Sequence, residues 1–77
     1  MQIEIISFGQ IASFISKQQI DNAAITDTDA LKTYLEKNYP QLQQLKYKLA
    51  LNKDIVQENR TLTNNDVVAL MPPFSGG

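Results

Sequence analysis

Residues 67–77, VVALMPPFSGG, decide the fold, because an apolar strand runs directly into a pair of prolines. The first five residues of this stretch are apolar on both faces, which is typical of a central strand with one side covered by a helix. The prolines have no N–H to donate, so the sheet ladder cannot continue past Met71, and two in succession keep the chain extended. The sequence therefore predicts a single domain over residues 1–77, with an extended C-terminal tail at residues 72–77.

The end of this tail is narrow enough to enter another protein. Ser75 has a small side chain and Gly76 and Gly77 have none, so the tail can bend inside a partner's active site. The carboxylate of Gly77 is then the most accessible reactive group, and a diglycine end is typical of small domains whose own C-terminus is the substrate. A frayed terminus is also often rich in glycine and serine. It needs no rigid proline spacer, however, so the proline pair favours the functional interpretation.

The composition indicates one small domain and argues against several classes of function. The chain has 77 residues, of which 43% are hydrophobic, enough for one packed core. A net charge of −1 argues against nucleic-acid binding, and no apolar run approaches the length of a membrane span. Cysteine and histidine are absent, and with them the usual thiol nucleophile, general base and metal ligands. With no signal peptide visible, we expect a soluble cytoplasmic domain that is not an enzyme by itself and binds no metal.

Outward from the last strand, hydrophobic periodicity predicts one main helix and a mixed sheet. The helix begins within Thr26–Asp29, where a polar side chain caps its N-terminus, and it ends before Pro40. Leu31, Tyr34 and Leu35 form its apolar stripe. Alternation and turn residues predict strands at residues 3–8, 18–25, 47–51, 55–56 and 67–71. The expected fold class is α+β, with the mixed sheet curled around the one main helix.

Shorter segments join these elements. Gly9 breaks the first strand, and residues 11–15 have the spacing of a short helix. Turns are expected at residues 52–54 and 63–66, the second with an asparagine that tolerates positive φ. Between the turns, the side chain of Leu62 is expected to pack into the core.

Alternation divides the last strand into two faces. If Val68 and Leu70 face the helix, then Val67, Ala69 and Met71 lie on the outer face of the sheet. A bare apolar sheet face usually marks an interface. Filling a core gap is the simpler alternative for Met71, and we favour docking to a partner.

The tail supplies the remaining candidates for partner binding. Phe74 lies beyond the prolines and outside any core that the pattern predicts, so docking is the better interpretation for this aromatic side chain. We therefore assign partner binding to five consecutive residues, Met71, Pro72, Pro73, Phe74 and Ser75.

Other polar and aromatic patterns are better explained by structure than by catalysis. Asp27 and Asp29 fit helix capping better than acid–base catalysis or metal binding. A row of lysines could form a basic edge, but a solvated strand face is the simpler interpretation of Lys46, Lys48 and Lys53. Packing between helix and sheet, with the hydroxyl at the surface, accounts for Tyr34, Tyr39 and Tyr47.

The two ends of the chain resemble one known family. The segments concerned are IEI at residues 3–5, FGQIA at residues 8–12, and residues 62–77 with the ending Pro-Pro-x-x-Gly-Gly. Over its whole length the chain is similar to the ubiquitin-like β-grasp sulfur carriers, and most similar to small subunits of molybdopterin synthase. There are two local departures. Residues 64–66 are Asn-Asn-Asp where the family more often has Asp-Gly-Asp, and Ser13 stands where the family often has an acidic residue.

The resemblance implies a chemistry centred on Gly77, with Gly76 giving access to it. An adenylating enzyme, similar to ubiquitin-activating enzymes, would activate the Gly77 carboxylate with ATP, and sulfur transfer would give a thiocarboxylate. The tail would then enter the large subunit of molybdopterin synthase, in a heterotetramer, and donate sulfur to cyclic pyranopterin monophosphate in molybdenum cofactor biosynthesis. The resemblance implies a non-catalytic, sulfur-donating subunit that holds no cofactor of its own.

Three alternatives stay open at this point. The first is a sulfur carrier of the same fold that serves thiamine or another thiolated product. The second is a ubiquitin-like modifier that is joined to lysines by an isopeptide bond. The third is a β-grasp interaction module with an inert terminus. The proline pair and the position of the diglycine favour the molybdopterin synthase subunit over all three.

Overall fold

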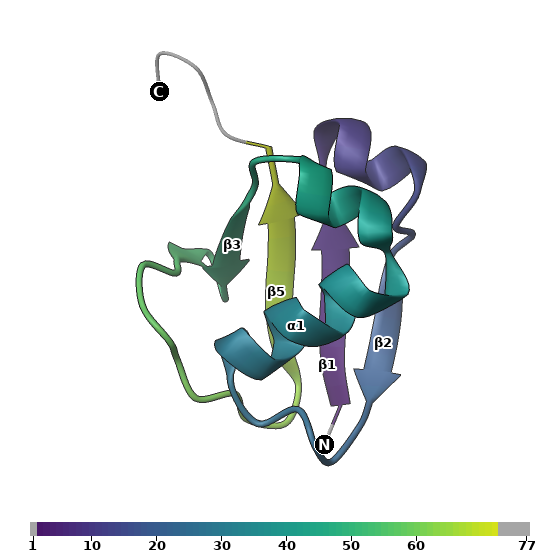
Figure 1. The fold of residues 1–77 in the computed structure, drawn as a ribbon. Coiled ribbons are helices and arrows are strands. Elements are labelled where there is room, and N and C mark those ends of the chain that lie inside the picture. Colours follow the sequence, from purple (N-terminus) through teal and green to yellow (C-terminus); the bar gives the residue numbers. More distant parts are fainter. Residues whose placement is uncertain (1, 73–77) are drawn as a thin grey trace.

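A computed structural model describes residues 2–72 and contains one five-stranded sheet, in the order β2-β1-β5-β3-β4 (Figure 1). The site residues Pro73, Phe74, Ser75, Gly76 and Gly77 lie outside the described residues. The elements in chain order are β1 (Gln2–Ser7), η1 (Gly9–Ser13), β2 (Gln18–Asp21), α1 (Thr28–Asn38), η2 (Pro40–Gln44), β3 (Lys48–Leu51), β4 (Asp54–Ile55) and β5 (Asp66–Met71). The expected mixed sheet with one main helix is confirmed.

The first and last strands form the centre of the sheet. β1 and β5 pair in parallel, with Ile3 opposite Asp66 and Ser7 opposite Leu70. β2 pairs with the other side of β1, and β3 with the other side of β5, both antiparallel. The carboxyl ends of β1 and β5 therefore lie at the same edge of the sheet, next to the root of the tail.

Helix α1 begins and ends where the sequence predicts. The N-cap is Asp27, whose Oδ1 accepts a hydrogen bond of 2.8 Å from the backbone N–H of Ala30. Tyr39 is the C-cap and Pro40 follows it, since a residue before proline is excluded from the helical region. Leu31 and Leu35 are fully buried and face the sheet.

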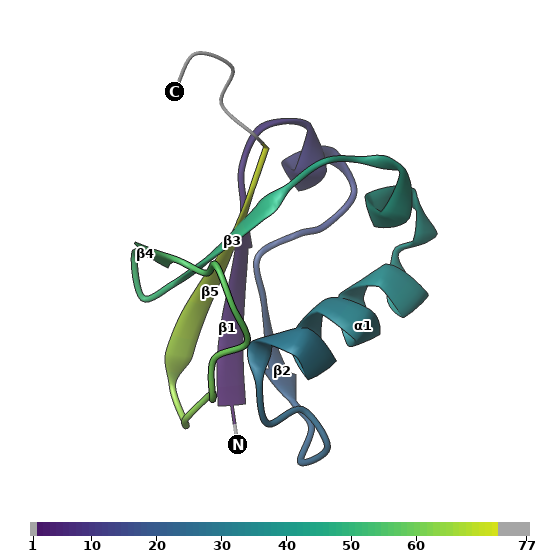
Figure 2. The ribbon, with the colours of Figure 1, turned by 60° about the vertical axis from the view of Figure 1, so that its left-hand side comes forward.

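The core lies between α1 and the inner face of the sheet. Figure 2 shows the helices gathered on this one side, and no helix within residues 2–72 covers the opposite face. Leu62 is buried as expected, and its N–H donates to the Thr26 carbonyl. The remaining members of the core cluster are Ile3, Ile5, Ile11, Ile15, Ile20, Ile25, Leu31, Leu35, Leu42, Leu49, Leu51, Val68 and Leu70. None of the helices in this part of the chain is both long and apolar enough to span a membrane.

Both predicted turns are present and use residues with positive φ. Asn52 and Lys53 have φ of 49° and 77° in the tight turn between β3 and β4. Asn65, just before β5, has φ of 70°, so an asparagine adopts the left-handed conformation in this turn, as the sequence predicts.

The second strand is shorter than predicted. β2 ends at Asp21, although residues 18–25 were expected to be extended. The Asn22 side chain accepts from the Ala24 N–H, and the Asn22 carbonyl accepts from the Ile25 N–H. These local bonds form a turn that competes with the sheet ladder. Ile25 is still a core residue, as expected, but it reaches the core from this turn.

Candidate docking surface and tail root

The last strand presents one buried and one outer face, as alternation predicted. Val68 and Leu70 are fully buried beneath α1. Val67, Ala69 and Met71 alternate with them and line a hollow on the outer face of the sheet. Met71 is partly exposed and does not belong to the core cluster, so the alternative of a core gap filler is wrong.

Two neighbouring alanines create this hollow. Ala69 on β5 pairs with Ile6 on β1 and with Ala50 on β3, and Ala50 pairs in turn with Ile55 on β4. Paired residues share a face of the sheet, so this outer row runs from isoleucine through two alanines to isoleucine. The two alanine side chains in the middle of the row are short and the isoleucine side chains at its ends are long, which leaves a depression between them. The hollow has a volume of about 550 Å³ and is lined by Ile6, Phe8, Ala50, Asn52, Lys53, Val67, Ala69 and Met71.

One large apolar side chain that lines the hollow, Phe8, is exposed, and so is Ile55 at the end of the outer row. Phe8 is 48% exposed and Ile55 is 43% exposed, and they are the exposed large hydrophobic residues of the described part of the chain. Neither residue is among the site residues predicted from the sequence. The sequence predicts Phe8 as a strand end and includes it in a segment similar to the sulfur carriers; the aromatic residue next to the strand-breaking Gly9 is the signal that could have indicated a surface role. Ile55 and Ala50 join the surface through strand register, which local patterns do not reveal.

The root of the tail is packed against the loop after β1. The Phe8 N–H donates to the Leu70 carbonyl over 3.0 Å, which extends the β1–β5 ladder by one bond. Gly9 follows with φ of +62°, and a Cβ at this position would lie 2.9 Å from Cγ of Pro72. The Pro72 ring thus occupies the space that a side chain at Gly9 would need. Of the predicted partner-binding residues, the structure places Met71 beside the hollow and Pro72 against Gly9.

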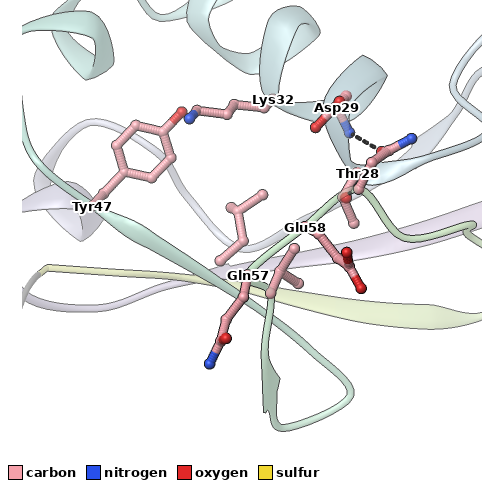
Figure 3. A pocket seen from close by; sticks show the side chains of 9 residues that line it. Thr28, Asp29, Lys32, Tyr47, Gln57 and Glu58 are labelled. Atoms are coloured by element: carbon pink, nitrogen blue, oxygen red, sulfur yellow. Dashed lines mark hydrogen bonds between the residues drawn. The ribbon is translucent and has the colours of Figure 1, made fainter.

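A second, smaller pocket lies on the helix side and is mainly structural (Figure 3). Its volume is about 150 Å³. The Lys32 ammonium lies 5.5 Å from the centre of the Tyr47 ring, and the Tyr47 hydroxyl donates to Glu36. Burial of Tyr47, with the hydrogen bond to Glu36 and the Glu36 charge, raises the pKa of its hydroxyl. These contacts attach the residue before β3 to α1 and confirm the packing predicted for Tyr47, although its hydroxyl bonds to Glu36.

The remaining polar predictions are also accounted for by structure. Asp27 caps α1, and Asp29 is an exposed acidic residue in its first turn. The side chains of Lys46, Lys48 and Lys53 are exposed, as expected for a solvated strand face. Within residues 2–72 there is no group of three or more acidic side chains placed to hold a metal ion.

Comparisons with known proteins agree with this architecture. The model of the ThiS family matches residues 5–77. A chain in a structure described as the complex of subunits 1 and 2 of the molybdopterin-converting factor from Helicobacter pylori is 28% identical, with a TM-score of 0.77 and 100% of both chains covered.

Two further structures are similar in fold. A Pyrococcus furiosus chain with the provisional description molybdopterin converting factor, subunit 1, has a TM-score of 0.84 at 15% identity, covering 95% of this chain and 98% of the other. SAMP1 from Haloferax volcanii has a TM-score of 0.77 at 18% identity, with 100% of both chains covered. At these identities the likeness concerns the fold alone. The expected ubiquitin-like β-grasp fold is confirmed.

Proposed function

The chain belongs to the ThiS family and has the fold of its sulfur carriers, and we propose that it is the sulfur-carrying small subunit of a molybdopterin synthase. The observation that carries the proposal is the continuity between the apolar hollow and the root of the tail. Met71 lines the hollow, and the next residue, Pro72, begins the segment that ends in Gly76-Gly77. A partner that covers the hollow therefore receives the tail as well.

The hollow has the properties of a docking surface for a larger subunit. Its floor is formed by the side chains of Ala50 and Ala69, and its rim carries the exposed ring of Phe8. The exposed ring of Phe8 would gain free energy when a partner removes it from water. The similarity to a chain from a complex of two molybdopterin-converting factor subunits, over the full length of both chains, supports a large subunit as that partner.

The proposed reaction takes place on the C-terminal carboxyl group. An adenylating enzyme joins the Gly77 carboxylate to AMP with release of pyrophosphate, which turns a poor electrophile into a reactive mixed anhydride. Sulfur at the oxidation level of sulfide then attacks the acyl carbon, AMP leaves, and the product is a thiocarboxylate. In the large subunit this sulfur is transferred to cyclic pyranopterin monophosphate. Because the first step consumes ATP, we place the chain in the cytoplasm.

In this proposal the chain itself does not catalyse a step. It positions the Gly77 carboxyl group and lets it enter the active site of the partner. The outer sheet face docks, the Pro72-Pro73 pair spaces the tail from the domain, and Phe74 anchors it in a pocket of the partner. Ser75 and the two glycines are small enough to pass into a buried active site. The groups that activate the carboxyl group and transfer the sulfur would belong to the two partner enzymes.

A second candidate is a sulfur carrier for thiamine or another thiolated product. Membership of the ThiS family leaves this candidate open. The Pro-Pro-x-x-Gly-Gly ending favours the molybdopterin synthase subunit, which the tail resembles most. Conjugation of Gly77 to lysines is a further alternative.

A mass measurement followed by a transfer assay tests the proposal. The chain recovered from its native cell should carry a C-terminal thiocarboxylate, seen as replacement of one oxygen by sulfur in the intact mass. Mixed with the large subunit and cyclic pyranopterin monophosphate, the thiolated chain should form molybdopterin and return to the carboxylate. A thiolated chain that is inert in this assay but supplies sulfur for thiazole formation would identify the second candidate. A chain recovered on lysine side chains would identify a modifier.

A further inference from the structure

Gly9 lies where the loop after β1 meets the root of the tail. Its φ of +62° is a left-handed conformation that L-residues other than glycine and asparagine rarely adopt. Its missing side chain is equally important. A Cβ at Gly9 would lie 2.9 Å from Cγ and 3.4 Å from Cδ of Pro72. The first of these distances is well inside the roughly 3.5–4.0 Å at which carbon atoms pack best.

The Pro72 ring lies close to Gly9 on one side and borders an open hollow on another. Besides its contact with Gly9, it lines a hollow of about 300 Å³ together with Gln10, Ile11, Leu45 and Lys46. The other walls of this hollow come from η1 and from the segment before β3, so residues from two distant parts of the chain border it together with Pro72.

This contact comes directly after the last bonds of the sheet ladder. The Phe8 N–H donates to the Leu70 carbonyl, and Met71 is the last residue of β5. Pro72 has no N–H that could continue the ladder. Because the ladder cannot continue through Pro72, packing of the Pro72 ring has to fix the direction of the chain after Met71.

We propose that Gly9 is a positioning residue for the tail: the space left by its missing side chain seats the Pro72 ring and so sets the direction in which the following residues leave the sheet. The consequence for sulfur transfer rests on the proposed function. Pro72 and Pro73 form a stiff pair, so a displaced Pro72 changes the starting direction of the whole tail. Misplacement of a reacting group by about 1 Å can slow a reaction up to roughly 100-fold.

Four variants separate the contact from backbone strain. Gly9→Asn introduces a Cβ but tolerates positive φ, so it mainly displaces Pro72. Pro72→Ala removes the ring atoms Cγ and Cδ and keeps Cβ, which lies at an ordinary contact distance of 3.8 Å from a Cβ at position 9. The double variant Gly9→Asn/Pro72→Ala therefore has no clash. Ala12→Asn is the matched control, because it places the same side chain on an exposed position of η1.

The structural measurement uses the isolated chain and does not depend on the proposed function. Nuclear Overhauser effects between the Gly9 α-protons and the Pro72 ring should be present in the wild type and in Ala12→Asn. Residual dipolar couplings of the tail amides should change in Gly9→Asn and stay unchanged in Ala12→Asn. A wild type without the Gly9–Pro72 effects, or a Gly9→Asn variant with unchanged couplings, would overturn the inference.

The functional measurement is single-turnover sulfur transfer at saturating large subunit. We expect Gly9→Asn to slow transfer about tenfold, within the range for small misplacements, with a melting temperature like that of Ala12→Asn. Against the Pro72→Ala background, the same Gly9→Asn change should have little further effect, because the atoms that it displaces are gone. Equal effects in both backgrounds would overturn the inference. A wild type that shows the contact but transfers no sulfur would contradict the proposed function alone.

Discussion

Asp66 shows how one side chain at the start of β5 holds two turns together. Its Oδ2 accepts from the Thr63 N–H over 2.7 Å, and its Oδ1 accepts from the Thr63 hydroxyl and from the Asn52 side chain. Partial burial by itself would raise the pKa of this carboxyl group. The hydrogen bonds from Asn52 and Thr63 and the nearby charge of Arg60 oppose it, and together they bring the pKa below its ordinary value of 3.8.

We therefore expect Asp66 to stabilise the fold in a pH-dependent way. A carboxyl group with a lowered folded-state pKa stabilises the fold above its unfolded-state pKa and loses this contribution as pH falls through the folded-state pKa. Asp66→Asn should lower the free energy of unfolding by about 1 kcal/mol at neutral pH, since asparagine has no charge and its amide nitrogen cannot accept the hydrogen bonds that one carboxylate oxygen accepts. Denaturant melts of both proteins should converge as pH falls below 3.8. A difference that stays constant down to pH 2 would contradict this role.

Phe74 follows the proline pair in the sequence, and we expect it to contribute to partner binding. An aromatic side chain on a stiff spacer loses little conformational entropy when a partner's pocket desolvates it. Phe74→Ala should weaken association with the large subunit by about 2 kcal/mol, within the range of interface hot spots. Titration calorimetry with the large subunit measures this loss. Denaturant melts of the free domain should be unchanged, and a variant that unfolds while binding normally per folded molecule would place Phe74 in the core instead.

At the scale of elements, helix α1 depends on its cap and on a segment that is distant in sequence. The Asp27 side chain accepts from Ala30 N–H and, over 3.3 Å, from the Asn59 side chain. The buried Thr28 donates its N–H to the Arg60 carbonyl, and its Oγ1 accepts from the Arg60 N–H. The first turn of the helix is thus attached to residues 59–60 as well as capped.

Removing the cap should have a larger effect than removing the neighbouring charge. Asp27→Ala should lower the free energy of unfolding by about 1 kcal/mol, the usual effect of losing an N-cap. Asp29→Ala is the matched control, because that exposed carboxylate acts mainly through the helix dipole and should contribute about 0.3 kcal/mol. Urea melts at neutral pH compare the two variants, and equal losses would show that capping is not the role of Asp27.

The outer face of the sheet gives a prediction about docking. Ala50 is 4% exposed and its Cβ points into the hollow, so Ala50→Leu should fill the hollow and leave the core unchanged. We expect association with the large subunit to weaken by at least about 1 kcal/mol, because a partner side chain loses its place. Thr33→Leu adds the same side chain on an exposed position of α1 and should bind normally. Binding of Ala50→Leu at wild-type strength, with unchanged melts, would mean that the hollow stays open in the complex.

How much the sequence predicts differs from element to element. The bounds of α1, the faces of β5 and the turn at Asn65 follow from periodicity, capping and turn chemistry, which are local properties. The early end of β2 was missed, because local bonds of Asn22 outcompete the ladder. The row from Ile6 to Ile55 and the contact of Gly9 with Pro72 depend on strand register. They join residues that are far apart in sequence, and patterns along the chain cannot show them.

At the scale of the whole molecule, the docking surface and the root of the tail lie at the same edge of the sheet. The outer hollow is lined by Phe8 and Met71, which stand at the carboxyl ends of the two central strands. The tail therefore starts beside the surface that we expect the partner to cover, and the distance from that surface to Gly77 is set by the number of residues between them.

The length of the tail should accordingly be critical. Deleting Gly77, or adding one residue after it, moves the terminal carboxyl group by about 3.5 Å, far beyond a reacting distance. We expect either change to abolish sulfur transfer and to leave thermal unfolding unchanged, since the core of the described residues is complete without Gly77. Molybdopterin formation and melting should be measured on the same samples. Full activity with an extended, unprocessed terminus would contradict the sulfur-carrier proposal.

The pairing of β1 with β5 also decides when this protein can fold during its synthesis. Ile3 is opposite Asp66, so the first strand cannot be completed until the last strand has been made. Without β5 the sheet would divide into the pairs β2–β1 and β3–β4, and the core would lack Val68 and Leu70. Contacts between such distant residues slow folding, because a long loop must close before they form. Nascent chains stalled before residue 66 should therefore be digested rapidly by proteases, and protection should appear only after β5 has emerged from the ribosome.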